Sequence, residues 1–106
     1  QYLLSTLGQK NYNRERDKEF EINRGICKSS LINELSYTIK ESIITINKLS
    51  LENLLKKRKV QVYYLSGIGC LIHAVEHFSY HTGQIALSTK NITNNELGFY
   101  DGIDLN

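Results

Sequence analysis

The three histidines of this 106-residue sequence, His73, His77 and His81, lie within a stretch of nine residues. If that stretch is helical, its residues advance by about 100° each, and the three imidazoles fall on one side of the helix. Imidazole is the commonest protein ligand of divalent transition metals. His77 and His81 would lie about 6 Å apart along a helix axis, and both rings can approach one ion, as in helical zinc motifs. The spacing therefore makes His77 and His81 candidate metal ligands that would form half of a site.

His73 fits such a site less well. It is eight residues, and so about 12 Å along the axis, from His81, whereas all ligands of one zinc ion approach to about 2.1 Å. A third ligand must therefore come from another segment. The alternative is a metal-free network in which buried histidines hydrogen-bond to backbone groups, Tyr80 or Gln84. Glu76 lies off the histidine side of the helix, so the sequence lacks the general base of an HExxH zinc protease.

The histidines need a helix to position them, and the pattern from Ser66 to about Asn91 predicts a long one. We call the polar side of this helix the histidine seam; it comprises Cys70, His73, His77, His81, Gln84 and Ser88. Apolar residues cover most of the other directions, so we expect protein around the helix and a seam that points inward. Gly69 and Gly83 would allow close approach of a neighbouring segment.

Other patterns predict further helices. An amphipathic helix is expected over 31–49, capped by Ser29 or Ser30, and its apolar face comprises Leu31, Leu35, Ile39, Ile43 and Ile46. Residues 2–7 predict the end of a helix stopped by Gly8, and residues 51–55 a short helical segment after Ser50. Residues 60–64 favour a short extended piece. Together these patterns predict an all-α up-and-down bundle forming a single domain over residues 1–106.

Composition and net charge limit the classes of binding partner to be expected. The net charge is +2, which indicates neither a nucleic-acid nor a membrane partner, and the basic run Lys56–Lys59 is expected to be a solvated corner, with nucleic-acid contact as the alternative. The charged connector 9–25 is expected to be a solvated loop. Cys27 and Cys70 lack a disulfide-framework spacing and favour reduced thiols in a cytoplasmic protein. The absence of methionine, with a helix-like start at Gln1, predicts that an N-terminal part is missing.

The long helix also resembles a known family motif. The segment His77-Phe-Ser-Tyr-His81-Thr-Gly-Gln84-Ile85 is similar to the last-helix signature of the DinB/YfiT-like superfamily, in which two histidines four residues apart precede any residue, glycine and glutamine. It looks most like the branch of small uncharacterised bacterial proteins whose last helix reads HYSYHxGQI. Residues 1–8 and 13–20 resemble the end of the second helix and the Arg/Asp-rich loop of that branch.

The resemblance implies a four-helix bundle that is incomplete in this chain, because the opening helix of the family would precede Gln1. It also implies a divalent-metal site of three histidines, with zinc or nickel as the expected ion. Two of the ligands are His77 and His81, and the third would lie before Gln1 and is absent from this chain. His73 matches no ligand position of the family, and Gln84 matches as a residue that supports the ligands.

The resemblance implies less about the reaction and the substrate than about the metal site. Some relatives are thiol S-transferases that use a low-molecular-weight thiol, and others are described only as metal-dependent hydrolases. The resemblance therefore implies a metal-binding protein with a small-molecule or thiol substrate. The alternative is a metal-free helical interaction module in which the seam is a buried polar network. A homodimer is expected in either case, because loss of the opening helix would uncover the apolar faces of helices 31–49 and 66–91.

Overall fold

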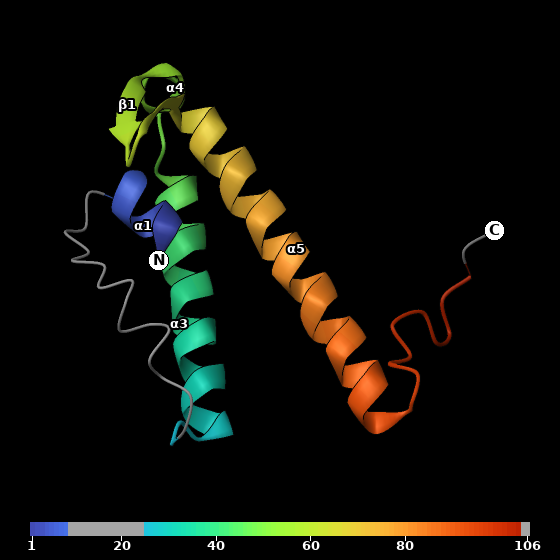
Figure 1. Ribbon diagram of the computed structural model, residues 1–106. Helices are drawn as coiled ribbons and strands as arrows, with labels where there is room; N and C mark the ends of the chain where they lie inside the picture. The colour runs from blue at the N-terminus through green and yellow to red at the C-terminus, as the bar shows by residue number, and fades with distance from the viewer. Residues whose placement is uncertain (9–24, 105–106) are drawn as a thin grey trace. The chain divides into compact units, whose positions relative to one another are not determined.

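The computed structural model describes residues 1–8 and 25–104 (Figure 1). Its elements in chain order are α1 (Tyr2–Thr6), α3 (Lys28–Asn47), α4 (Leu51–Leu55), β1 (Lys57–Val60), β2 (Tyr63–Ser66) and α5 (Gly67–Thr93). They divide into two compact units, Gln1–Ala74 and Val75–Asn106, with the boundary inside α5. The single domain over residues 1–106 stays a prediction, and most of the predicted connector lies outside the described residues.

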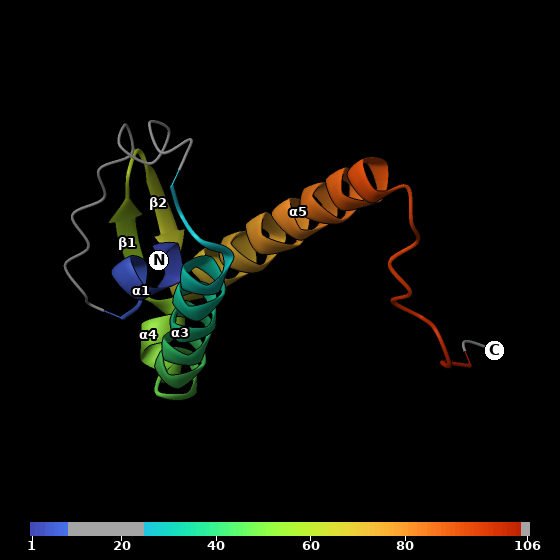
Figure 2. The same ribbon diagram turned by 90° about the horizontal axis from the view of Figure 1, so that it is seen from below.

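The prediction of an all-α four-helix bundle is wrong, because the first unit contains a β-hairpin (Figure 2). β1 and β2 pair antiparallel, with Lys59 opposite Tyr64 and Val60 opposite Tyr63. Val60 is buried while Lys59 is exposed, which is the period-two alternation of a strand. Gln61 makes the turn with a φ of 56°, in the left-handed region where glycine or asparagine is usual. Because neither glycine nor asparagine occupies this turn position, the usual sequence signal of a hairpin is absent.

A small apolar core holds the first unit together. Its buried side chains come from α1 and the residue after it, β1 and the start of α5: Leu3, Leu4, Leu7, Val60 and Cys70. A five-residue helix such as α1 is not stable alone, so burial of its leucines is what stabilises it. Arg58 adds polar contacts, because its Nη1 donates to the Thr6 carbonyl at 2.9 Å and its Nη2 to the Asn53 carbonyl at 2.6 Å. These bonds tie β1 to both α1 and α4.

The start of α3 differs from its prediction. The helix begins at Lys28 and its N-cap is Cys27 rather than Ser29 or Ser30. The two serines fall in the first turn, where their hydroxyls hydrogen-bond to the Cys27 thiol instead of to backbone N–H groups. By contrast, the short helix predicted after Ser50 is present as α4, and Ser50 caps it, since its Oγ accepts a hydrogen bond from the Asn53 backbone N–H at 3.2 Å.

The junction of α4, β2 and α5 depends on Gly67. A Cβ at this position would lie 2.4 Å from the Asn53 carbonyl oxygen and 2.8 Å from the Leu54 Cα. The close approach predicted at Gly69 and Gly83 therefore occurs at Gly67. A Cβ on Gly69 would meet side chains at ordinary contact distance, and one on Gly83 would meet nothing within 4 Å.

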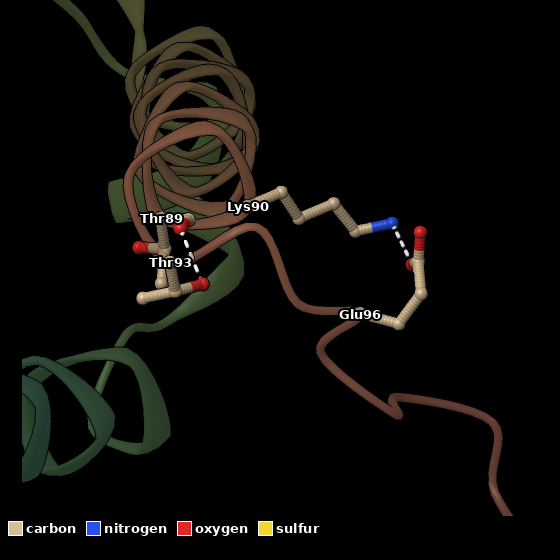
Figure 3. Close-up of polar contacts among 4 residues, drawn as sticks. All are labelled: Thr89, Lys90, Thr93 and Glu96. Carbon is tan, nitrogen blue, oxygen red and sulfur yellow. Dashed lines mark hydrogen bonds and ion pairs between the residues drawn. The ribbon is translucent and has the colours of Figure 1, made fainter.

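The end of α5 is defined by local hydrogen bonds (Figure 3). The Thr93 hydroxyl donates to the Thr89 carbonyl at 2.8 Å, and Lys90 forms an ion pair with Glu96 in the following segment. Asn94 then adopts a φ of 52°, the left-handed conformation that commonly follows a helix. The helix thus ends two residues beyond the predicted boundary near Asn91.

Candidate metal centre

His77 and His81 lie one turn apart on α5, in the second unit. Their ring centroids are 4.5 Å apart and their ring planes meet at 69°. The four-residue spacing therefore places both imidazoles on the same side of the helix, as predicted. Both side chains are exposed, so an ion can reach them from solvent.

The predicted burial of the histidine seam is wrong for this described helix. Cys70 is fully buried, whereas the other seam residues are exposed: His73, His77, His81, Gln84 and Ser88. The apolar residues expected to be covered by neighbours, such as Val75, Phe78 and Ile85, are exposed as well. An apolar pattern indicates what a helix can bury, but the burial itself requires a partner surface.

Gln84 connects the histidine pair to Tyr80. Its Nε2 donates to the Tyr80 hydroxyl at 3.0 Å, and its Oε1 lies 2.8 Å from Nδ1 of His81. A carbonyl oxygen can only accept a hydrogen bond, so in this arrangement Nδ1 of a neutral His81 carries the proton. The lone pair then resides on Nε2. Gln84 therefore orients His81 and leaves its Nε2 available to a ligand, which is the usual role of a group that supports a metal-bound histidine.

His73 has a different environment, although it lies on the same stripe of α5. Its ring packs edge-to-face against Tyr2 in the first unit, with centroids 4.9 Å apart. Burial, followed by the charge of the neighbouring Cys70 thiol and a hydrogen bond to it, raises the pKa of Tyr2. His73 thus takes part in the contact between α5 and α1.

The donor set fits part of a metal site. Two imidazoles on one helix face are suitable ligands for zinc or nickel, and Gln84 accepts from His81 the hydrogen bond that a metal-bound histidine normally donates through its other ring nitrogen. Within residues 1–8 and 25–104, however, no group of three or more histidine, cysteine, aspartate or glutamate side chains is placed to hold an ion. The pair therefore supplies two ligands.

A chemically distinctive residue outside the seam is Cys27. The hydroxyls of Ser29 and Ser30 lie 3.1 and 2.9 Å from its sulfur. Hydrogen bonds from these two serines lower the pKa of the exposed Cys27 thiol from 9.0 to about 7. The sequence alone predicts only a reduced thiol at Cys27. The signal was the order Cys-Lys-Ser-Ser at a predicted helix start, where a thiolate can accept from nearby hydroxyls.

The fold and the site define a mainly helical protein that carries an exposed histidine pair on its longest described helix. The chain belongs to the family described as "Protein of unknown function (DUF1572)", which matches residues 1–100 and so includes the whole His77–Gln84 motif. No curated protein and no solved structure matches the chain. None of the helices in the described ranges is long and apolar enough to cross a membrane.

Proposed function

We propose that the protein binds a divalent transition-metal ion, zinc or nickel, through His77 and His81, in the manner of the DinB/YfiT-like proteins. The observation that carries the proposal is the exposed pair itself, with ring centroids 4.5 Å apart. Gln84 supports it by holding His81 with the proton on Nδ1. The histidine, glycine and glutamine spacing of this segment is also the part of the sequence that resembles that superfamily.

A bound ion with open coordination positions would supply Lewis-acid chemistry, lowering the pKa of a bound water or thiol. That chemistry suits a hydrolase or a low-molecular-weight-thiol S-transferase acting on a small molecule. In either reaction the chain's own contribution would be to hold the ligands. Tyr80, whose hydroxyl lies beside Gln84, could orient a bound group. Two free cysteines, Cys27 and Cys70, support a cytoplasmic location for this activity.

The test is a titration of zinc or nickel into three single variants. His77→Ala and His81→Ala should each weaken metal affinity at least tenfold, because one imidazole remains. His73→Ala, the matched control on the same helix stripe, should bind metal as the parent does. Equal binding by all three variants, or loss of binding in His73→Ala alone, would refute the assignment. In the second case the ligands would be His73 and His77.

A second candidate function is a metal-free helical interaction module that forms a homodimer. The observation in its favour is α3, a helix of 20 residues with none buried, whose apolar face is exposed in the described structure. Exposed apolar surface of this kind commonly marks an interaction site. Metal analysis of the untagged protein distinguishes the two functions, since an interaction module needs no bound ion.

A further inference from the structure

The β1–β2 hairpin carries a local positive charge that is larger than the net charge of the chain. From Asn53 to Val75 the sequence contains three lysines and one arginine, all within Lys56–Lys59, and no aspartate or glutamate. With histidine neutral, this segment has a formal charge of +4, whereas the whole chain has +2. The three lysines are exposed. Exposed positive charge concentrated on so short a segment attracts polyanions.

The contacts of β1 determine which lysines share a face of the hairpin (Figure 2). Val60 is buried in the core, and Arg58 is hydrogen-bonded to backbone carbonyls of α1 and α4. Because side chains alternate along a strand, Lys57 and Lys59 lie on the opposite face. At a rise of about 3.3–3.4 Å per residue, their Cα atoms are about 7 Å apart. Two cations in a row along a strand can contact neighbouring phosphates of one extended chain.

The register of the hairpin adds an aromatic ring to this face. Tyr64 lies directly opposite Lys59, and directly opposed side chains project on the same side of an antiparallel pair. Tyr64 is 72% exposed, so a flat partner can reach its ring. We call this surface the hairpin face; it comprises Lys57, Lys59 and Tyr64. Proteins that bind single-stranded nucleic acid combine cations that contact the phosphates with aromatic rings on which bases stack.

We propose that the hairpin face binds single-stranded nucleic acid, with Lys57 and Lys59 contacting phosphates and Tyr64 stacking on a base. A single strand is favoured over a duplex because paired bases present their edges to a protein, whereas an unpaired base presents its flat face. It is favoured over an anionic membrane because membrane binding needs a larger apolar surface, and the turn of the hairpin contributes one aliphatic residue, Val62. This activity is separate from metal binding by the histidine pair.

The test measures binding of the full 106-residue chain to a fluorescein-labelled oligothymidylate by fluorescence anisotropy at several salt concentrations. Lys57→Gln and Lys59→Gln should each weaken binding and lower the magnitude of the salt slope by about 0.7, the value for one phosphate contact on a single strand. Tyr64→Ala should weaken binding about 5- to 150-fold through loss of one stacked base, and Tyr64→Phe should bind as the parent does. Lys40→Gln and Tyr37→Ala, at exposed positions of α3, are the matched controls and should have no effect.

Three further ligands separate the proposal from its rivals. A strand of the same length without bases should bind the parent and Tyr64→Ala equally, since it offers nothing on which the ring can stack. A duplex of the same length should bind more weakly than the single strand, and equal affinity would overturn the proposal. Vesicles of phosphatidylserine and phosphatidylcholine that bind the parent when oligothymidylate does not would replace it with a membrane surface. Hairpin-face variants that bind oligothymidylate as the two controls do would also refute it.

Discussion

The proton on His81 is set by its neighbour Gln84. The amide oxygen of Gln84 faces Nδ1 of His81 because its nitrogen donates to the Tyr80 hydroxyl. With the amide reversed, its N–H would face Nδ1, which would suit the other tautomer of His81, and its oxygen would accept from the Tyr80 hydroxyl. In the observed orientation the amide oxygen faces Nδ1, which goes with the form of His81 that has its proton on Nδ1 and its lone pair on Nε2.

Gln84→Ala should therefore weaken zinc binding without removing a ligand. Loss of a hydrogen-bonding partner of a metal-bound histidine typically lowers affinity about 10- to 100-fold. Gln84→Glu should retain most of the affinity, because a carboxylate also accepts from Nδ1–H. Zinc titration, with nitrogen NMR of the His81 tautomer in metal-free protein, measures both effects. Unchanged affinity and tautomer in Gln84→Ala would show that Gln84 does not position His81.

Cys27 should react as a thiolate near neutral pH. Hydrogen bonds from Ser29 and Ser30 lower the pKa of its thiol to about 7, so its alkylation rate by iodoacetamide should reach half of its maximum near pH 7. In the double variant Ser29→Ala/Ser30→Ala the midpoint should move up toward 9 and the rate at pH 7 should fall. Mass spectrometry of the Cys27 peptide follows the reaction. An unshifted midpoint in the double variant would exclude the serines as the cause.

For individual residues, the sequence predicted which side chains share a helix face, because helical periodicity determines that. His77 and His81 share a helix face because they are four residues apart, and that spacing is visible without a structure. The role of the Cys27 thiol was missed because it depends on where α3 begins. A shift of the helix start to Lys28 turned two expected capping serines into hydrogen-bond partners of a sulfur atom.

Among the elements, the start of α5 offers a sharp test of packing. Gly67→Ala should lower the free energy of unfolding by about 1–3 kcal/mol, because the new methyl group would meet backbone atoms of Asn53 and Leu54. The matched control is Gly83→Ala, in the same helix but with nothing within 4 Å of its Cβ position. That change should leave stability unaltered or raise it by about 0.5–1 kcal/mol.

Urea unfolding followed by circular dichroism measures both glycine variants. Equal midpoints for the parent and Gly67→Ala would mean that α4 can move away from α5 at little cost. A destabilised Gly83→Ala would instead indicate that a neighbour approaches Gly83, as the sequence analysis expected.

Element prediction succeeded where one pattern extends over many residues. The long helix was expected over 66–91 and spans Gly67–Thr93, since its apolar and polar residues repeat over seven turns. The hairpin was predicted only as one extended segment over 60–64. Its turn was missed because Gln61 occupies a position that normally holds glycine or asparagine. Short elements stabilised by tertiary contacts, such as β1 with Arg58, give a weak local signal.

For the whole molecule, the exposed face of α3 predicts self-association that does not require metal. Leu35→Glu, near the middle of that face, should reduce both dimer formation in chelator and binding of an apolar dye. Asn33→Glu changes the charge equally on another side of the helix and is the matched control. Sedimentation velocity and dye fluorescence provide the measurements. A parent chain that is monomeric and binds no dye would contradict the prediction.

The packing of the helices against one another was the feature that the sequence predicted least well. Amphipathic helices identify surfaces that can be buried, but α3 has no buried residue and the face of α5 beside the histidines is exposed. Which surfaces meet depends on long-range packing, to which residue periodicity gives no direct access. The described core instead depends on leucines of a five-residue helix meeting Val60 and Cys70.

Because Cys70 is buried, the reactivity of its thiol reports how often the core of the first unit opens. With 0% of Cys70 exposed, a thiol reagent can attack it only during moments when the surrounding core separates. The ratio of its labelling rate in buffer to that in urea therefore gives the fraction of molecules open, each factor of ten corresponding to about 1.4 kcal/mol. Exposed Cys27, in the same compact unit, confirms in every sample that the reagent is active. Local stability can thus be read from two native thiols without an added label.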